Sequence, residues 1–422
     1  MGNKSKKKTF SLAGTFKTKG KNKPKGEPAQ RGNTVSKPAN EEQSRFQIVN
    51  GTRKRNKKMR IIFYCIIGVV IVALLITHFL LPTGLLEGIQ NGYSALGSGD
   101  FPVSFYAANP TDYVKYGNIS CTLNQTYFEV YNEKGKLIQA VSHGLSNPKL
   151  EVSESRFLLF DRDRYSVKIF KYSTELHTAQ FKNTIISADI GRDGTYAVVT
   201  NADSYLATVY VYNKNNDLIF TWNSANNYIT DVAVLNNGKS IAVSYFNAQN
   251  GSFKSTVGIF DFKSDSPNVK YEIDGLVSAL KSVNNNYIIA HGVDFAKVIP
   301  WNGGSVTDLS VNGVIRHTDI ADNGQSAVVY GREYNETNNS VSIIGKSGKS
   351  IAQFDFNAII NDVSLSDESI LILSNEKIYR VDYSGNILSE TVLEIKPLHI
   401  GAVNNKECLA FDNSKMNRIK LS

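Results

Sequence analysis

Short apolar strands recur in sets of four between residues 101 and 422. In the clearest set the strands are Ile229–Val234, Ile241–Tyr245, Val257–Phe262 and Val269–Ile273. Asn-Gly, Asp-Gly and Ser-Gly pairs separate many of the runs, and such pairs favour tight hairpins because Gly and Asn tolerate positive φ. Four-stranded sets with a period of about 36 to 47 residues are typical of β-propeller blades. We therefore predict an all-β fold, with a β-propeller at 101–422.

The number of sets predicts the number of blades. They begin near Tyr113, Lys149, Ile185, Ile229, Leu276, Val314, Ile360 and Pro397. Eight blades are predicted, and seven is the alternative if one of the weaker sets is a loop. The set from Pro397 has only about three strands, whereas Phe101–Tyr106 is one strand with no set of its own. We expect this N-terminal strand to complete the last blade, because that closure removes two unpaired sheet edges.

An apolar run at residues 61–81 precedes the repeats and contains no Asp, Glu, Lys or Arg. Its length matches one crossing of a bilayer, and the basic segment Arg53–Arg60 lies directly before it. We predict one uncleaved transmembrane helix at 61–81, a linker at 82–100 and a cell-membrane location. The N-terminus is then cytoplasmic and the C-terminal domain extracellular. A cleaved signal peptide is disfavoured because its apolar core is shorter and nearer the N-terminus.

The charge of the chain is unevenly distributed. Residues 1–60 contain 18 Lys or Arg and 3 Glu, whereas residues 82–422 contain 29 Lys or Arg and 35 Asp or Glu. We predict that the tail, 1–60, is disordered and attracted to anionic lipid headgroups. It is either a solvated topology signal or a docking arm for an acidic partner. Nucleic acid is disfavoured as a partner because no base-reading motif is present.

Several segments resemble a known family. They are Tyr212–Trp222, Tyr228–Ala233, Asn247–Gly251 and His143–Pro148. With these segments the chain resembles a Firmicutes family of uncharacterised single-pass membrane proteins with a propeller-like extracytoplasmic domain of unknown function, over residues 60–422. The resemblance implies a propeller fold and a Gram-positive bacterial origin. It implies no activity and no catalytic residues.

Acidic residues recur where the first strand of a set opens. They are Glu151, Asp189, Asp231, Asp319 and Asp362, with Ser278 and His399 at the equivalent places. First strands of blades line the central channel, so one hypothesis is an acidic ring that holds a cation or a basic group. The alternative is that each carboxylate caps an inter-blade turn by accepting backbone N–H bonds.

Two cysteines fall at similar places in the first and last sets. Cys121 and Cys408 would lie on neighbouring blades of a closed ring, and a disulfide between them would staple the closure. The alternative is two free thiols.

Motifs for catalysis or cofactor binding are missing from the sequence. The six His are scattered without metal-ligand spacing, and two Trp are too few for repeated Trp stacking between blades. We therefore predict no cofactor, no metal and no enzyme, but a binding or scaffold module with a protein partner at the cell envelope. The alternatives are a transmembrane sensor and an envelope enzyme that uses the propeller channel.

Overall fold

The computed structural model describes residues 61–71, 96–154, 156–172, 174–235, 238–249, 251–283 and 286–422. The chain divides into two compact units, Met1–Ala73 and Leu74–Ser422. In the first unit the described residues, 61–71, form one exposed helix. The predicted tail, 1–60, and residues 72–95 of the predicted span and linker lie outside the described residues.

The predicted cell-membrane location is wrong. In the part of the chain that the structure describes, no helix is both long and apolar enough to cross a bilayer. This finding overturns the predicted cell-membrane location with a cytoplasmic N-terminus and an extracellular C-terminal domain.

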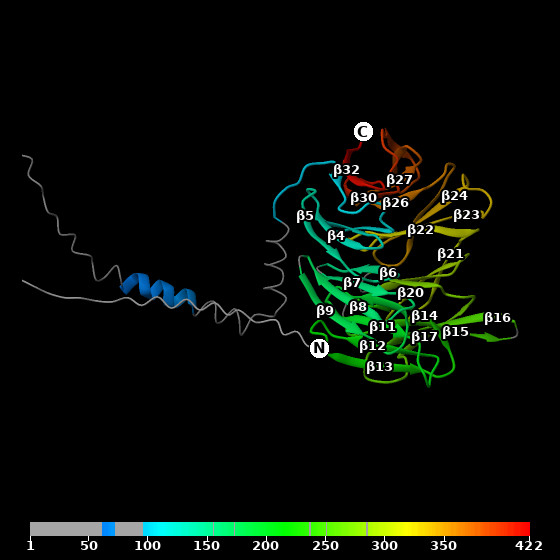
Figure 1. Ribbon diagram of the computed structural model, residues 1–422. Helices are drawn as coiled ribbons and strands as arrows, with labels where there is room; N and C mark the ends of the chain where they lie inside the picture. Colours follow the sequence, from blue (N-terminus) through cyan, green and yellow to red (C-terminus); the bar gives the residue numbers. More distant parts are fainter. Residues whose placement is uncertain are drawn as a thin grey trace, which may run out of the picture. The chain divides into compact units, whose positions relative to one another are not determined.

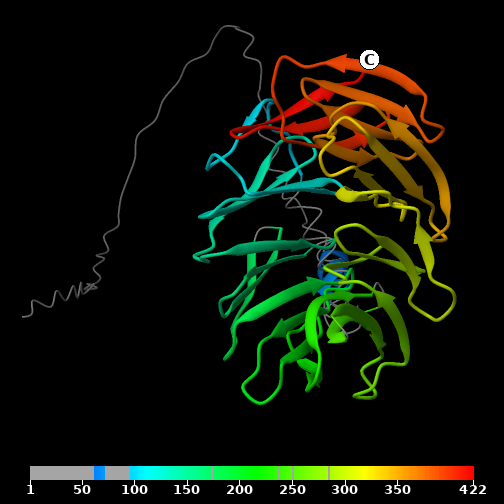
Figure 2. The same ribbon diagram turned by 90° about the vertical axis from the view of Figure 1, so that its right-hand side faces the viewer.

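The second unit is an eight-bladed β-propeller, as predicted. Its described residues form eight four-stranded antiparallel sheets that follow one another around a ring (Figures 1 and 2). The first four blades are β2 (Asp112–Tyr116), β3 (Ile119–Leu123), β4 (Tyr127–Asn132) and β5 (Leu137–Ser142); β6 (Pro148–Val152), β7 (Arg156–Asp161), β8 (Ser166–Lys171) and β9 (Thr174–Gln180); β10 (Ile185–Ile190), β11 (Tyr196–Thr200), β12 (Ala207–Tyr212) and β13 (Leu218–Ser224); and β14 (Tyr228–Val234), β15 (Ile241–Gln249), β16 (Ser252–Phe260) and β17 (Val269–Asp274).

The other four blades complete the ring. They are β18 (Ala279–Ser282), β19 (Tyr287–His291), β20 (Ala296–Pro300) and β21 (Thr307–Leu309); β22 (Val314–Ile320), β23 (Ser326–Gly331), β24 (Asn339–Ile344) and β25 (Ser350–Phe356); β26 (Asp362–Leu365), β27 (Ser369–Ser374), β28 (Lys377–Asp382) and β29 (Ile387–Val392); and β30 (His399–Asn404), β31 (Glu407–Phe411), β32 (Lys415–Lys420) and β1 (Val103–Ser104).

The hydrophobic core lies between adjacent blades. Side chains alternate between the two faces of each sheet, so second strands such as β7, β23 and β27 are buried along their whole length. Between the first two blades, for example, the ring centroids of Phe128 and Phe157 are 5.3 Å apart. The continuous apolar runs of the sequence therefore correspond to strands covered on both faces.

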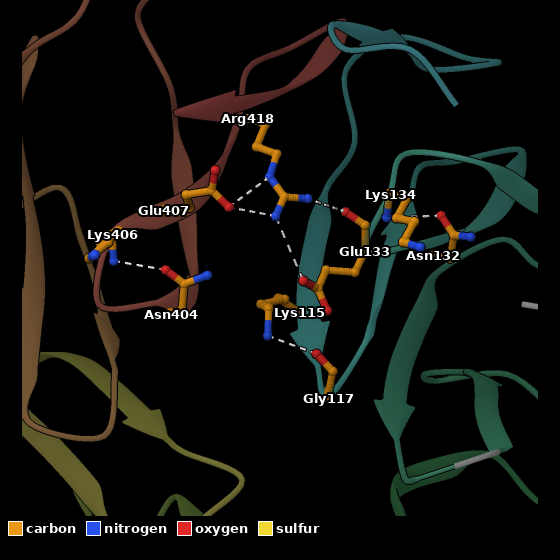
Figure 3. Close-up of polar contacts among 9 residues, drawn as sticks. All are labelled: Lys115, Gly117, Asn132, Glu133, Lys134, Asn404, Lys406, Glu407 and Arg418. Carbon is orange, nitrogen blue, oxygen red and sulfur yellow. Dashed lines mark hydrogen bonds and ion pairs between the residues drawn. The ribbon is translucent and has the colours of Figure 1, made fainter. Parts of the chain in front are cut away.

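The ring closes as the sequence predicted. β1 pairs with β32 through Val103 opposite Met416 and Ser104 opposite Lys415, and so completes the eighth blade. Arg418 on β32 strengthens the junction with the first blade (Figure 3). Its guanidinium donates to Glu407 Oε2 at 2.6 Å and to the backbone oxygen of Glu133 at 3.1 Å.

The end of the predicted linker belongs to the propeller. The backbone oxygen of Gly97 accepts a hydrogen bond from Asn132 Nδ2 at 2.8 Å, and Gly99 N donates to Lys134 O at 3.0 Å. Hydrogen bonds thus tie the chain just before the predicted start of the propeller to the turn after β4.

Candidate functional site

The first strand of each blade lies nearest the axis of the ring, where first strands of neighbouring blades contact one another. Four of the five predicted acidic residues accept a hydrogen bond from a backbone N–H on the next blade. The four pairs are Asp189 Oδ2 with Val234 N at 2.6 Å, Asp231 Oδ2 with Leu280 N at 2.8 Å, Asp319 Oδ2 with Leu365 N at 2.6 Å, and Asp362 Oδ2 with Ile400 N at 2.8 Å. The four donors lie in first strands, so these carboxylates join the first strands of consecutive blades.

Glu151 instead faces a lysine that the sequence reasoning missed. Lys281 Nζ on the fifth blade lies 3.4 Å from both carboxylate oxygens of Glu151 on the second blade. The negative charge of Glu151, and then those of Asp189 and Asp231, raise the pKa of Lys281. Burial raises the pKa of Glu151 to about 7, against the opposite effect of Lys281. Three of the predicted ring members thus surround a cation that the chain itself supplies.

The axial cavity beside Lys281 is small, with a volume of about 170 Å³. It is lined by first-strand residues from six blades, among them Tyr116, Glu151, Asp189, Val234, Lys281 and Ile320. At the end where first strands finish, Arg192 Nη2 on the third blade donates to Asp322 O on the sixth at 3.5 Å. Side chains therefore cross the channel at two levels.

Asp319 and Asp362 belong to a separate cluster that contains two histidines. His399 Nδ1 lies 3.3 Å from Asp362 Oδ2, and His317 Nδ1 lies 4.0 Å from Asp362 Oδ1. Burial acts to lower the pKa of His399, but the hydrogen bond and the charge of Asp362 outweigh it and raise the pKa. Burial lowers the pKa of His317. Within the described ranges, no group of three or more His, Cys, Asp or Glu is placed to hold a metal ion.

The two cysteines of the propeller, for which the sequence left a disulfide and free thiols open, are not bonded to each other. Both thiols are buried and free, Cys121 on β3 and Cys408 on β31. Cys121 packs among residues of the first and second blades, whereas Cys408 packs among residues of the seventh and eighth. Because the two side chains point away from the interface that their blades share, no bond between them is possible.

One face of the propeller collects the exposed aromatic side chains. This face, the aromatic face, is made by the connections from second to third strands and from each blade to the next. Across the described propeller residues, six aromatic side chains are exposed, and all lie in these connections or at the adjoining strand ends. They are Tyr106, Tyr165, Tyr205, Tyr228, Phe253 and Tyr334. Exposed aliphatic side chains instead occur mainly on the outermost strands β5, β9, β13, β25 and β29.

Charge is sparse in one of the two kinds of connection that make the aromatic face, the blade-to-blade connections, whereas most second-to-third connections carry charged residues such as Arg332 and Glu336. In the described propeller, six of the eight blade-to-blade connections contain no Asp, Glu, Lys or Arg. These six are 105–111, 143–147, 225–227, 275–278, 310–313 and 357–361. Their polar residues are mainly Asn and Ser, which make hydrogen bonds without net charge.

Some of these features left a signal in the sequence and others did not. Asp112 opens the first set with the acidic pattern of the other blades, and burial raises its pKa. That pattern should have added it to the predicted group. Lys281 had no such signal, because its contact with Glu151 crosses the ring. The exposure of Tyr205 also left no signal in the sequence. Tyr196, nine positions earlier, is the same residue type but is buried, so residue type alone does not distinguish the two.

The chain is thus an eight-bladed β-propeller with charged side chains across its channel and exposed aromatic side chains on one face. The chain belongs to a family of unknown function, DUF5711, whose model matches residues 103–421. This match confirms the propeller part of the resemblance noted in the sequence. The Gram-positive origin stays a prediction. No curated protein matches the chain.

Solved structures share the fold. The C-terminal WD40 domain of Sif2 is 9% identical with a TM-score of 0.51, and the match covers 77% of this chain and 100% of that one. Sqt1 of Saccharomyces cerevisiae is 11% identical with a TM-score of 0.51, covering 78% and 99%. BamB of Moraxella catarrhalis is 10% identical with a TM-score of 0.46, covering 75% and 99%. At identities this low, Sif2 and Sqt1 show the fold alone.

Proposed function

We propose that this protein is a non-catalytic binding or scaffold module that holds a protein partner on its aromatic face. The observation behind the proposal is that the six exposed aromatic side chains of the described propeller gather on one face. Tyr and Phe are enriched in protein interfaces, where one rigid side chain buries a large area and loses few rotamers. Tyr334, 95% exposed, is an example of such an anchor.

The chemistry of the channel supports a non-catalytic function. A general acid or base must be able to reach a substrate. Here Asp189 and Asp231 accept backbone hydrogen bonds, and Glu151 faces Lys281. These groups are engaged in holding the ring together, which argues against an enzyme that uses the channel.

A comparison of two surface variants of the full chain tests the proposal. One carries Tyr106→Ser, Tyr205→Ser and Tyr334→Ser on the aromatic face. The matched control carries Leu218→Ser, Ile387→Ser and Val392→Ser on outermost strands, which removes a similar number of exposed apolar groups. Proteins that co-purify from cells of the native host are quantified for each variant and for the unchanged chain.

We expect the aromatic-face variant to lose its specific partner by at least about tenfold, because aromatic anchors dominate interface energies. The control should retain the partner within about twofold. Equal melting temperatures would show that both variants are folded. Equal retention by both, loss only in the control, or no specific partner for the unchanged chain would contradict the proposal.

A further inference from the structure

A second recognition surface lies on the fourth blade. Its middle strands, β15 and β16, pair with each other as far as Gln249 and Ser252, beyond the pairing that either makes with its outer neighbour. The hairpin therefore projects from the ring (Figure 1). Because side chains alternate along a strand, one face of this projection carries a grid of six polar side chains. One row is Tyr245, Thr256 and Glu272, and the next is Asn247, Lys254 and Asp274.

The grid borders a cavity of about 430 Å³, here called the hairpin notch. This volume is within the range of about 300 to 1,000 Å³ that small-molecule sites occupy. Asn227 closes one side of the notch, where Asn247 Nδ2 donates to Asn227 Oδ1 at 3.5 Å. Tyr245 forms the inner end and packs against Trp222 with ring centroids 5.5 Å apart.

The charges of the notch restrict the chemistry of its ligand. Lys254 Nζ lies 3.7 Å from Asp274 Oδ1, so the site already contains an ammonium group that disfavours a cationic ligand. Glu272 and Asp274 likewise disfavour an anion. The remaining groups are amides, a hydroxyl and carboxylate oxygens, a mixture of donors and acceptors that suits hydroxyl groups, because each hydroxyl both donates and accepts.

We propose that the hairpin notch binds an uncharged carbohydrate. The ligand's hydroxyl groups donate to Glu272 and Asp274 and accept from the amides of Asn227 and Asn247. This site is separate from the protein partner proposed above, and neither depends on the other.

Calorimetric titration of the full chain tests the notch directly and needs no protein partner. The uncharged probes are maltotetraose, cellotetraose and the tetramer of N-acetylglucosamine. The charged probes are the tetramers of glucosamine and of galacturonic acid. Two variants change the notch, Asn247→Ala and Glu272→Ala. The control, Lys270→Ala, alters an exposed residue on the same face of β17 but outside the cavity.

We expect saturable binding of at least one uncharged probe, weaker binding of both charged probes, and a loss of about tenfold for each notch variant. The control should bind within about twofold of the unchanged chain. Absence of saturable binding by every uncharged probe overturns the proposal. Preference for a charged probe, or equal affinity in both notch variants and the control, also overturns it. Loss of the protein partner in the aromatic-face variant has no bearing on this result.

Discussion

Buried carboxylates in this ring hold the backbone of neighbouring segments in place. Glu129, which is fully buried on β4, accepts hydrogen bonds from Tyr106 N at 2.8 Å and Ala107 N at 3.1 Å, and the hydroxyl of Tyr131 also donates to it. Asp319 has the same kind of function between two blades through Leu365 N. A backbone N–H satisfies a carboxylate whose removal from water is otherwise costly.

Asp319 gives stability a predictable dependence on pH. Burial raises the pKa of Asp319 from 3.8 to about 6, so the folded state binds this proton more tightly than the unfolded state. The resulting stabilisation is complete below pH 3.8 and is lost as the pH rises to about 6. Asp319→Asn removes this dependence and keeps an oxygen that accepts from Leu365 N. Asp319 is only half-buried, so solvent weakens the effect. Between pH 4 and 7 the difference in free energy of unfolding between the variant and the unchanged chain should therefore change by on the order of 1 kcal/mol.

Urea unfolding at pH 4, 5, 6 and 7 measures this difference. The matched control is Asp265→Asn, which changes an exposed aspartate in the connection between β16 and β17. The free energy of unfolding of Asp319→Asn should rise relative to that of the unchanged chain as the pH increases. Parallel curves for the two proteins would contradict the assigned cause.

The short strand β1 closes the ring by pairing with β32. Met416, fully buried on β32, lies opposite Val103 and packs among Phe105, Leu409 and Phe411. Met416→Ala should reduce the free energy of unfolding by about 2 to 5 kcal/mol, because it leaves a cavity at the closure. Chemical denaturation measures the loss.

The control for this prediction is Leu388→Ala on β29. Leu388 is half exposed, so its truncation should cost no more than about 0.5 kcal/mol. Similar losses in the free energy of unfolding for the two variants would contradict the prediction. They would mean that the junction of the first and last blades stabilises the fold no more than the outer surface of a blade does.

Strands and their grouping were predictable because each blade is a local unit. Turns such as Asp193-Gly194 and runs such as Ile241–Tyr245 lie close together in the sequence, and the incomplete last set identified the partner of the N-terminal strand. The targets of the acidic residues were not predictable. Asp189 pairs with Val234, 45 residues later, and only the packing of two blades sets that register.

The orientation of the two cysteines was not predictable for a similar reason. Their blades are neighbours, as predicted, but a strand has two faces, and Cys121 and Cys408 occupy the faces that look away from each other. Sequence spacing placed the two residues on neighbouring blades but did not reveal which face of its strand each side chain occupies.

The whole propeller presents two different surfaces. Its axis is crossed by its own charged side chains, whereas the aromatic face carries exposed Tyr and Phe side chains and blade-to-blade connections that mostly lack charge. Binding that rests on the aromatic side chains should therefore depend little on salt. We expect the affinity for the protein partner to vary by less than about threefold between about 0.05 and 0.5 M NaCl.

Measurement of the partner's dissociation constant across this range of salt checks the expectation. A decrease in affinity of tenfold or more would mean that charged residues of the second-to-third connections, such as Arg332 and Glu336, dominate recognition instead.

Photo-crosslinking tests the central claim most directly. A photoreactive amino acid replaces Tyr106, Tyr205 or Tyr334 on the aromatic face, or Leu218, Ile387 or Val392 on outermost strands, in the full chain within living cells. We predict that the three aromatic-face positions crosslink to the same protein and that the outer positions do not. Crosslinks to that protein from the outer strands, with none from the aromatic face, would contradict the account.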